Sequence, residues 1–308
     1  MRTYLDCIPC FFAQALAAAR ISGANENMQK KILDEVAKLA PEFSMESTPP
    51  AIGRIVYRLV SKITGNEDPF REIKKNSNQL ILNLYPELEA LVENSKDRIL
   101  CAIRLAITGN IIDYGALASF NGALASFNIE EEVRKSLKSE FSVFDYSKFK
   151  QALDNTKSIL YLGDNAGEIV FDKLLIEELR KLGKKITYVV KDKPIINDVL
   201  LEDAHDCGID KIAKVMSNGG DTAGTVLSLC SKEFLEIYHE APFIISKGQG
   251  NFETLSGERA PLFFLFKVKC PVIARDIGCK VKDMILKSNL PTPPGKTPTS
   301  HANNLETR

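Results

Sequence analysis

The sequence carries no net charge, no apolar run of membrane-spanning length and no even set of cysteines. Lys plus Arg and Asp plus Glu number 40 each in the 308 residues, so the overall charge gives no reason to expect binding to nucleic acid or to an anionic membrane. A transmembrane helix needs about 20 consecutive apolar residues, and the chain has no such run. Asp6, Pro9 and Gln14 interrupt the apolar N-terminal stretch, which also lacks a small-residue cleavage site. These absences favour a cytoplasmic protein without a secretory leader.

The seven cysteines do not form the pattern of a disulfide framework. Cys7 and Cys10 form a CxxC motif, which is found in redox pairs, in metal sites and in buried thiol pairs. A thioredoxin-like motif follows a strand, whereas this one precedes a helical pattern. A zinc site needs further ligands, and because no second CxxC is present, Cys270 is the best third candidate. We expect a structural pair, with an auxiliary metal or redox role as the alternative.

Length and hydrophobic content indicate roughly two domains, of which the first covers residues 1–150. Apolar side chains recur there at helical spacing, while runs of β-branched residues are scarce. Proline at 49, 50 and 69 marks helix starts, and Gly65 suits a helix C-terminus. Residues 98–107 are almost all apolar, which indicates a buried helix. We therefore predict an all-helical N-terminal domain.

The pattern changes at Ser158, where short apolar runs begin to alternate with helical stretches. We predict strands at 159–162, 186–190, 213–216, 243–246 and 271–274. This alternation is typical of a mainly parallel sheet with helices on both faces, so residues 151–290 are expected to form a three-layer α/β/α domain.

The tail at 291–308 is rich in Pro, Thr and Asn and is predicted to be disordered. The heptad GALASFN, repeated at 115–121 and 122–128, is too short for a solenoid and indicates a local duplication.

Polar groups follow the predicted strands, at what would be one edge of a parallel sheet. In chain order they are Asp164, Asn165 and Glu168 after the first strand, Lys191 and Asp198 after the second, Asp221 after the third, and Lys247 and Asn251 after the fourth. Each segment alone is also typical of an ordinary turn or helix cap. Open α/β sheets bind ligands at this edge, so the coincidence favours a single site.

The chemistry of these groups indicates a divalent cation beside a phosphate. Asp164, Asn165 and Asp198 can supply three oxygen ligands to an ion whose remaining positions are taken by water. Lysine side chains and backbone N–H groups beside glycines can hold a phosphate opposite the ion. This pairing is typical of metal-assisted transfer of a phosphoryl group to water, with Asp164 and Asp198 as the catalytic carboxylates. We add Asp221 to the phosphate-binding candidates because it belongs to the same predicted edge.

Several separated segments also resemble the damage-control phosphatase family, formerly known only as a domain of unknown function. These segments are GDNAGE, the pattern K-x-x-P-x-x-N-D at 191–198, GDTAGT, KGQGNFETL, AITGNIIDYG and the early TPP and DPF segments. They occur in the same order over most of the chain. The arrangement is closest to the stand-alone archaeal and bacterial branch, which carries an early CxxC.

The resemblance implies a phosphatase that uses Mn²⁺, Co²⁺, Ni²⁺ or Mg²⁺ to hydrolyse small phosphorylated metabolites in damage control, such as sugar phosphates, phosphopantetheine-like esters or nucleotide-type esters. It implies that Asp164, Asn165 and Asp198 bind the metal. It places Glu168, Lys247, Asn251 and Lys269 on the substrate or its phosphate, and it adds Asn110 and Asp113 from the helical domain. Two departures from the family pattern, the tandem heptad and the proline-rich tail, bear on substrate fit more than on metal binding.

The sequence excludes some other functions and leaves two of them open. The first predicted strand is followed neither by the G-x-G-x-x-G of a dinucleotide-binding enzyme nor by the second Asp of a phosphatase with an aspartyl nucleophile. An S-adenosylmethionine-dependent methyltransferase could use the same kind of sheet, but it would not need Asp198 as an ion ligand. A non-enzymatic metal-binding regulatory protein would not turn over a phosphate ester. The sequence does not specify the substrate, the physiological metal or the oligomeric state.

Overall fold

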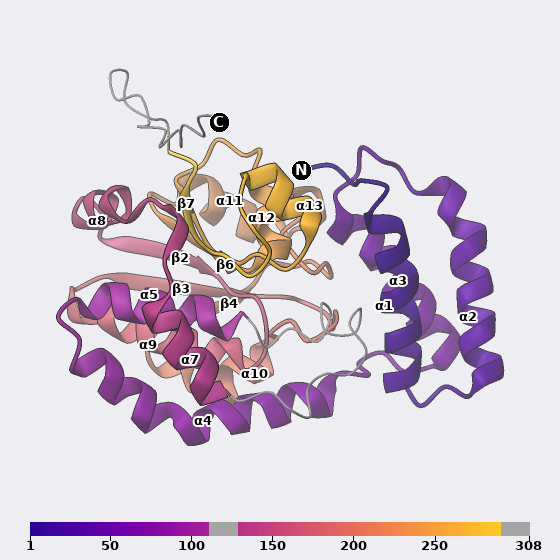
Figure 1. Ribbon diagram of the computed structural model, residues 1–308, viewed down its shortest axis with the longest axis horizontal. Helices are drawn as coiled ribbons and strands as arrows, with labels where there is room; N and C mark the ends of the chain where they lie inside the picture. The colour runs from indigo at the N-terminus through magenta and orange to yellow at the C-terminus, as the bar shows by residue number, and fades with distance from the viewer. Residues whose placement is uncertain (111–128, 291–308) are drawn as a thin grey trace, which may run out of the picture.

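The structure, a computed structural model, describes residues 1–110 and 129–290. The tandem heptad, Asp113 and the proline-rich tail lie outside the described residues. Figure 1 shows helices of the N-terminal part of the chain beside a twisted sheet that has helices on both of its faces. The predicted α/β class, with a helical region before a mainly parallel sheet, is confirmed.

The first helices form an apolar core of their own. They are α1 (Cys7–Ile21), α2 (Glu26–Leu39), the 3-10 helix η1 (Ala40–Glu42) and α3 (Pro49–Thr64). Asn25 caps α2 by accepting a hydrogen bond from the Met28 N–H, and α3 begins with proline and ends at Gly65 in the left-handed conformation. Phe11 and Val36 are among the buried side chains that these helices share. The predicted helix start at Pro49 and the Gly65 cap are confirmed.

Three further helices lead from this region onto one face of the sheet: α4 (Arg71–Glu93), α5 (Arg98–Gly109) and α7 (Ile129–Lys138). Asp97 caps α5 by accepting a hydrogen bond from the Leu100 N–H. The apolar helix predicted at 98–107 is buried as expected, but it packs along α9 (Glu168–Lys181) and against β6 (Leu262–Lys267) rather than only among helices. Among the described helices, none combines the length and apolar character that a membrane span requires.

Seven strands form one sheet in the order β1-β7-β6-β5-β2-β3-β4. Besides β6, their bounds are β1 (Phe141–Phe144), β2 (Ser158–Leu162), β3 (Lys185–Val190), β4 (Lys214–Ser217), β5 (Ile244–Lys247) and β7 (Met284–Ser288). Neighbouring strands are parallel except for β6 and β7, which are antiparallel. The sheet is therefore mainly parallel, as predicted.

Side chains that alternate along the strands build one apolar core on each face of the sheet. Ile159 and Tyr161 point to the face covered by α4, α5 and α9, whereas Leu160 and Leu162 point to the opposite face. The remaining helices are α8 (Tyr146–Asp154), α10 (Leu201–Asp206), η3 (Ile209–Lys211), η4 (Leu227–Leu229), α11 (Lys232–Glu240), α12 (Gln249–Leu255) and α13 (Pro271–Ile277). Of these, α11, α12 and α13 cover the second face.

Four of the five predicted strands correspond to β2, β3, β4 and β5. The fifth prediction, at 271–274, is wrong, because Pro271 occupies the first turn of α13, where its missing N–H breaks no helical hydrogen bond. The strand that pairs with β5 there is β6, and β1 and β7 were also missed. Because β1 belongs to the sheet, the sheet includes residues before 150, and the domain boundary at that residue stays a prediction.

The strand order turns at β2, which pairs with β3 on one side and with β5 on the other. On one side of β2 the sheet continues with β3 and then β4, and on the other side it continues with β5 and then β6. In open α/β sheets, ligands bind at the carboxyl ends of the two strands where the order reverses, which here are β2 and β5. The segment GDNAGE follows β2 and the segment KGQGN lies at the end of β5, so the fold places the two segments side by side.

Candidate active site

The candidate site is built on the turn between β2 and α9, which carries Asp164, Asn165 and Glu168. Gly163 passes so close to Tyr188 that a Cβ there would lie 2.5 Å from the tyrosine hydroxyl oxygen. The turn is sharp, and all three polar side chains are buried, with exposed fractions of 6%, 3% and 0%. Buried polar groups are costly unless they are paired, so their partners define the site.

Backbone hydrogen bonds join this turn to the loop after β3. The Ala166 N–H donates to the Asn197 carbonyl at 2.8 Å, and the Val199 N–H donates to the Asp164 carbonyl at 2.9 Å. Asn165 and Asp198 form an isolated antiparallel bridge. The loop therefore brings Asp198 beside Asp164 and Asn165, which the sequence could only suggest from the strand pattern.

Lys191, at the start of the same loop, is a buried cation next to Asp198. Its Nζ lies 3.5 Å from Asp198 Oδ2 and donates to the Gly224 carbonyl at 3.1 Å. The two side chains are only 2% and 3% exposed. Water therefore screens their attraction much less than it would at the surface.

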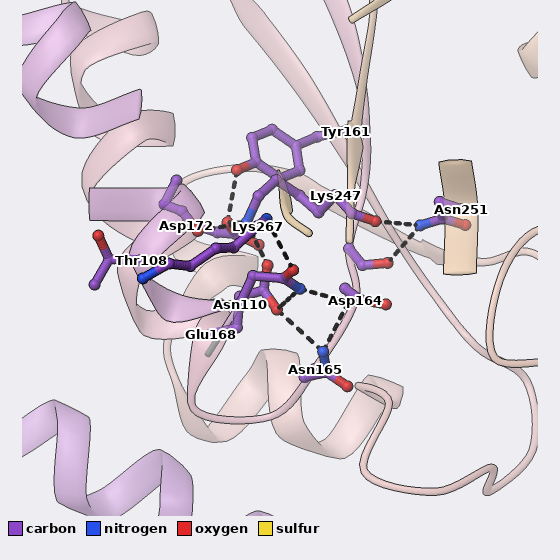
Figure 2. Close-up of polar contacts among 12 residues, drawn as sticks. Thr108, Asn110, Tyr161, Asp164, Asn165, Glu168, Asp172, Lys247, Asn251 and Lys267 are labelled. Carbon is purple, nitrogen blue, oxygen red and sulfur yellow. Dashed lines mark hydrogen bonds and ion pairs between the residues drawn. The ribbon is translucent and has the colours of Figure 1, made fainter. Parts of the chain in front are cut away.

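Two asparagines bind the carboxylates of the turn in the same way (Figure 2). Asn110 Nδ2 donates to Asp164 Oδ2 at 2.9 Å and to Glu168 Oε2 at 3.0 Å. Asn165 Nδ2 donates to the same two oxygens at 2.7 and 3.1 Å. Because ionised carboxylates only accept hydrogen bonds, both amides must present nitrogen to them and oxygen elsewhere. The Asn110 oxygen accepts a hydrogen bond from the Lys267 N–H at 3.3 Å, and the Asn165 oxygen points away from both carboxylates in Figure 2.

Lys247, at the end of β5, lies on the other side of Glu168 and is fully buried. Its Nζ donates to Glu168 Oε1 at 2.6 Å, to the Ala106 carbonyl at 2.9 Å and to Asp172 Oδ1. Burial by itself lowers the pKa of Lys247, but the charges of Asp172 and Glu168 outweigh it and hold this pKa above its usual value. All three ammonium protons are used, so the phosphate contact predicted for Lys247 would require one of these bonds to be exchanged.

Asn251 and Gly248 close the site from the segment after β5. Asn251 Nδ2 donates to the Lys247 carbonyl at 2.8 Å and to the Gly163 carbonyl at 3.3 Å, while its oxygen accepts from the Thr225 hydroxyl at 2.7 Å. Gly248 has a φ of 79°, and a Cβ there would lie 1.8 Å from Asp164 Oδ2. Only glycine fits this approach of backbone to carboxylate.

The fold thus gathers most of the predicted site residues, namely Asn110, Asp164, Asn165, Glu168, Asp198, Lys247 and Asn251.

Three predicted site residues are not part of this group. Asp221 instead forms ion pairs with Arg54 and Arg58 of α3, at 2.5 and 2.6 Å. It lines a hollow of about 490 Å³ between α3 and the loop after β3. The Lys269 N–H donates to Gln249 at 2.9 Å, and Asp113 lies outside the described residues. The roles assigned to these residues stay predictions.

Three buried partners were absent from the predicted set: Asp172, Lys191 and Gly248. Asp172 lies four residues after Glu168, a spacing that puts both carboxylates on one side of a helix. Lys191 directly follows β3 and was placed at the predicted edge of the sheet, but without a role of its own. The close approach of Gly248 to Asp164 has no signal in a single sequence.

Cys7 of the CxxC pair lies near Cys270 and Glu253. Burial raises the pKa of the Cys7 thiol to about 11, with smaller contributions from Glu253 and Cys270, and burial also raises that of Cys10. Burial thus favours the neutral thiol in both side chains when no ligand is bound. In the described part of the chain, no three or more His, Cys, Asp and Glu side chains are arranged to hold a metal ion. The structural role of the pair stays a prediction.

A variant with both Cys7→Ser and Cys10→Ser is expected to keep its enzymatic activity to within about twofold, because half-buried thiols with the structural role predicted for this pair contribute little beyond packing. The measurement is kcat/KM together with the melting temperature, with Cys101→Ser as a control for loss of a buried thiol elsewhere. A folded double variant without turnover would place the cysteines in the active site.

A doubly wound sheet that collects buried carboxylates, amides and lysines at its switch point defines an α/β protein with an acidic active-site cluster. The family model described as the damage-control phosphatase ARMT1-like domain matches residues 3–285. The chain belongs to this phosphatase family, and the resemblance noted in the sequence is confirmed.

Relatives in archaea support this assignment. A damage-control phosphatase of Pyrococcus horikoshii is 34% identical over 280 residues, which cover 90% of this chain and 94% of that protein. A damage-control phosphatase of Archaeoglobus fulgidus is 34% identical over 91% of this chain and 97% of its own length. A crystal structure described as a duf89 family protein from Pyrococcus horikoshii superposes with a TM-score of 0.84 at 32% identity, covering 94% of this chain and 99% of that chain.

Proposed function

We propose that this protein is a metal-dependent phosphatase that hydrolyses small phosphate monoesters in damage control. The observation that carries the proposal is the charge of the buried cluster at the switch point. It contains four carboxylates, Asp164, Glu168, Asp172 and Asp198, and two ammonium groups, Lys191 and Lys247, all at most 6% exposed. The ionised cluster therefore has an excess of two negative charges, which one divalent cation would neutralise.

The residues present fit such an ion. Asp164 and Asp198 offer carboxylate oxygens, and the Asn165 amide gives its nitrogen to Asp164 and Glu168, so that its oxygen can serve the ion. Divalent cations such as Mg²⁺ and Mn²⁺ prefer oxygen ligands, and they keep water molecules in the positions that the protein does not fill. No ready-made trio of acidic or histidine ligands occurs among the described residues, so the set depends on the amide and on water. Bound there, the ion would polarise a phosphoryl oxygen and make water more nucleophilic.

The side chains around these ligands prepare the site for an anionic substrate. Glu168 and Asn110 hold Asp164 and Asn165 in place, which restricts the ligand oxygens to one arrangement. Lys191 and Lys247 lower the negative potential of the cluster, so that an incoming phosphate is repelled less strongly. Burial keeps these charges effective, because little water screens them.

Hydrolysis is expected to stop when divalent ions are removed with a chelator and to return when Mn²⁺, Co²⁺, Ni²⁺ or Mg²⁺ is added back. The experiment is a screen of phosphorylated metabolites, including sugar phosphates and nucleotide-type esters, that measures released inorganic phosphate. The same ion should also raise the melting temperature without substrate, since a ligand present at 100 times its Kd stabilises the folded state by about 2.7 kcal/mol.

Turnover that survives complete chelation would contradict the metal requirement. A protein that binds the ion but hydrolyses none of the esters would instead be the non-enzymatic alternative. Methyl transfer from S-adenosylmethionine, measured on the same preparation, serves as the control for the other alternative, and the proposal expects none.

A further inference from the structure

Asp172 is a buried carboxylate that touches none of the proposed metal ligands. It lies on α9, one turn after Glu168, and its exposed fraction is 0%. It accepts hydrogen bonds from the Tyr161 hydroxyl at 2.7 Å and from the Tyr188 hydroxyl at 3.1 Å. Its third partner is Lys247. Burying a charge in this way costs several kcal/mol unless every partner is in place. The presence of a buried carboxylate at position 172 therefore needs a physical explanation.

Two ion pairs connect Asp172 to the turn between β2 and α9, which carries the proposed metal ligands Asp164 and Asn165 (Figure 2). Lys247 bridges Asp172 and Glu168, and its third proton is held by the Ala106 carbonyl of α5. Glu168 uses one oxygen for this lysine and the other for the amides of Asn110 and Asn165. The series therefore runs from two tyrosines, through a carboxylate, a lysine and a second carboxylate, to the amide of a proposed metal ligand.

We propose that Asp172 is a positioning residue for the hydrolytic site. It fixes the ammonium of Lys247, which fixes Glu168, which in turn orients the Asn165 amide with its oxygen outward. This inference rests on the proposed function, because its readout is hydrolysis. A lysine held by one carboxylate could swing between acceptors, whereas two carboxylates and a carbonyl leave it a single position.

The groups that face Lys247 set its pKa, so the pH dependence of hydrolysis can report on the role of Asp172. They come from Asp172 and Glu168 of α9 and the Ala106 carbonyl of α5, while Tyr161 of β2 and Tyr188 of β3 reach it only through Asp172. Asp172 helps to keep the pKa of Lys247 raised against the effect of burial. Removing its charge lowers that pKa, so the lysine loses its proton at a lower pH.

The test is Asp172→Asn, which keeps the shape of the side chain but removes its charge. The matched control is Glu177→Gln on the same helix, where the carboxylate also accepts a hydrogen bond from a tyrosine, Tyr85, at 2.7 Å, but faces α4. We expect Asp172→Asn to lower kcat/KM at saturating metal by about 10²-fold, because a displacement of about 1 Å at reacting groups costs that much. The metal concentration for half-maximal activity should rise, and the alkaline fall of the pH–rate profile should move to lower pH.

The control should change neither the pH profile nor the metal requirement, even if its melting temperature falls. Parent-like kcat/KM and an unmoved alkaline limb in folded Asp172→Asn would overturn the inference while leaving the phosphatase proposal intact. If the parent protein shows no metal-dependent hydrolysis, it is the proposed function that fails. Should Asp172→Asn not fold, Tyr161→Phe removes one anchor of the same carboxylate, and parent-like kinetics in that variant would equally overturn the inference.

Discussion

Asp198→Asn is expected to reduce the hydrolysis of phosphate esters by about 10³-fold while leaving the protein folded. The carboxylate is 2% exposed beside Asn165, and asparagine keeps its size. The substitution removes one of the two excess negative charges of the cluster and one proposed metal ligand. A bound ion stabilises the transition state by several kcal/mol, and each 1.4 kcal/mol corresponds to a factor of ten in rate.

The matched control is Asp192→Asn, six residues earlier in the same loop. Asp192 is exposed, and its side chain accepts a hydrogen bond from the Ser217 hydroxyl at 3.1 Å, outside the cluster. This variant should retain parent kinetics. Circular dichroism and thermal melting would verify the fold of both proteins, and full activity in folded Asp198→Asn would remove this residue from the mechanism.

Gly248→Ala should cost about 10²-fold or more in kcat/KM, although the substitution adds a single methyl group. The new Cβ would lie 1.8 Å from Asp164 Oδ2, a separation that non-bonded atoms do not tolerate. Since Asp164 is also bound by Asn110 and Asn165, relieving the clash displaces a proposed ligand together with its partners. Gly248 also combines a φ of 79° with a ψ of 161°, a backbone conformation that is essentially restricted to glycine, so the substitution adds about 1–3 kcal/mol of lost stability.

Gly183→Ala separates the two effects. Gly183 has a φ of 75°, close to that of Gly248, but no atom lies within 4 Å of the position of its Cβ. This variant should lose less stability than Gly248→Ala, measured by denaturant unfolding, and should keep the kinetics of the parent protein. If Gly248→Ala loses no more activity than Gly183→Ala, the approach of the KGQG segment to Asp164 has no catalytic consequence.

Periodicity was sufficient to locate the centre of the sheet and most of the candidate site. The strands β2, β3, β4 and β5 are continuous apolar runs, and polar groups at their ends must converge once the strands are parallel. For this reason the positions of Asp164, Asp198 and Asn251 could be predicted without knowledge of the loops. The helix starts at Pro49 and Asp97 follow from local capping chemistry, which depends on only a few neighbouring residues.

The remaining features depend on contacts that one sequence does not encode locally. The run at 271–274 is as apolar as a strand, but Pro271 stands in the first turn of α13, as Pro49 does in α3, and the run packs against the sheet as a helix. Asp221 belongs to a glycine-rich strand end, yet two arginines of α3, which lie far from it in sequence, bind it. Asp172 is one of several acidic residues of α9 and nothing in the local sequence singles it out, although two tyrosines and a lysine bury it completely.

The order in which the strands join the sheet has a consequence for folding. Asp164 follows β2, and Glu168 and Asp172 lie on the next helix, α9, but β5, the neighbour of β2 in the sheet, comes only after β3 and β4 in the chain. Lys247 is 79 residues from Glu168 and 75 from Asp172, so closing these ion pairs requires a long and slow loop closure. Until then the carboxylates have no buried counter-charge and are better left hydrated. A nascent chain that ends before β5 thus resists collapse at this point, and docking of Lys247 couples completion of the sheet to formation of the site.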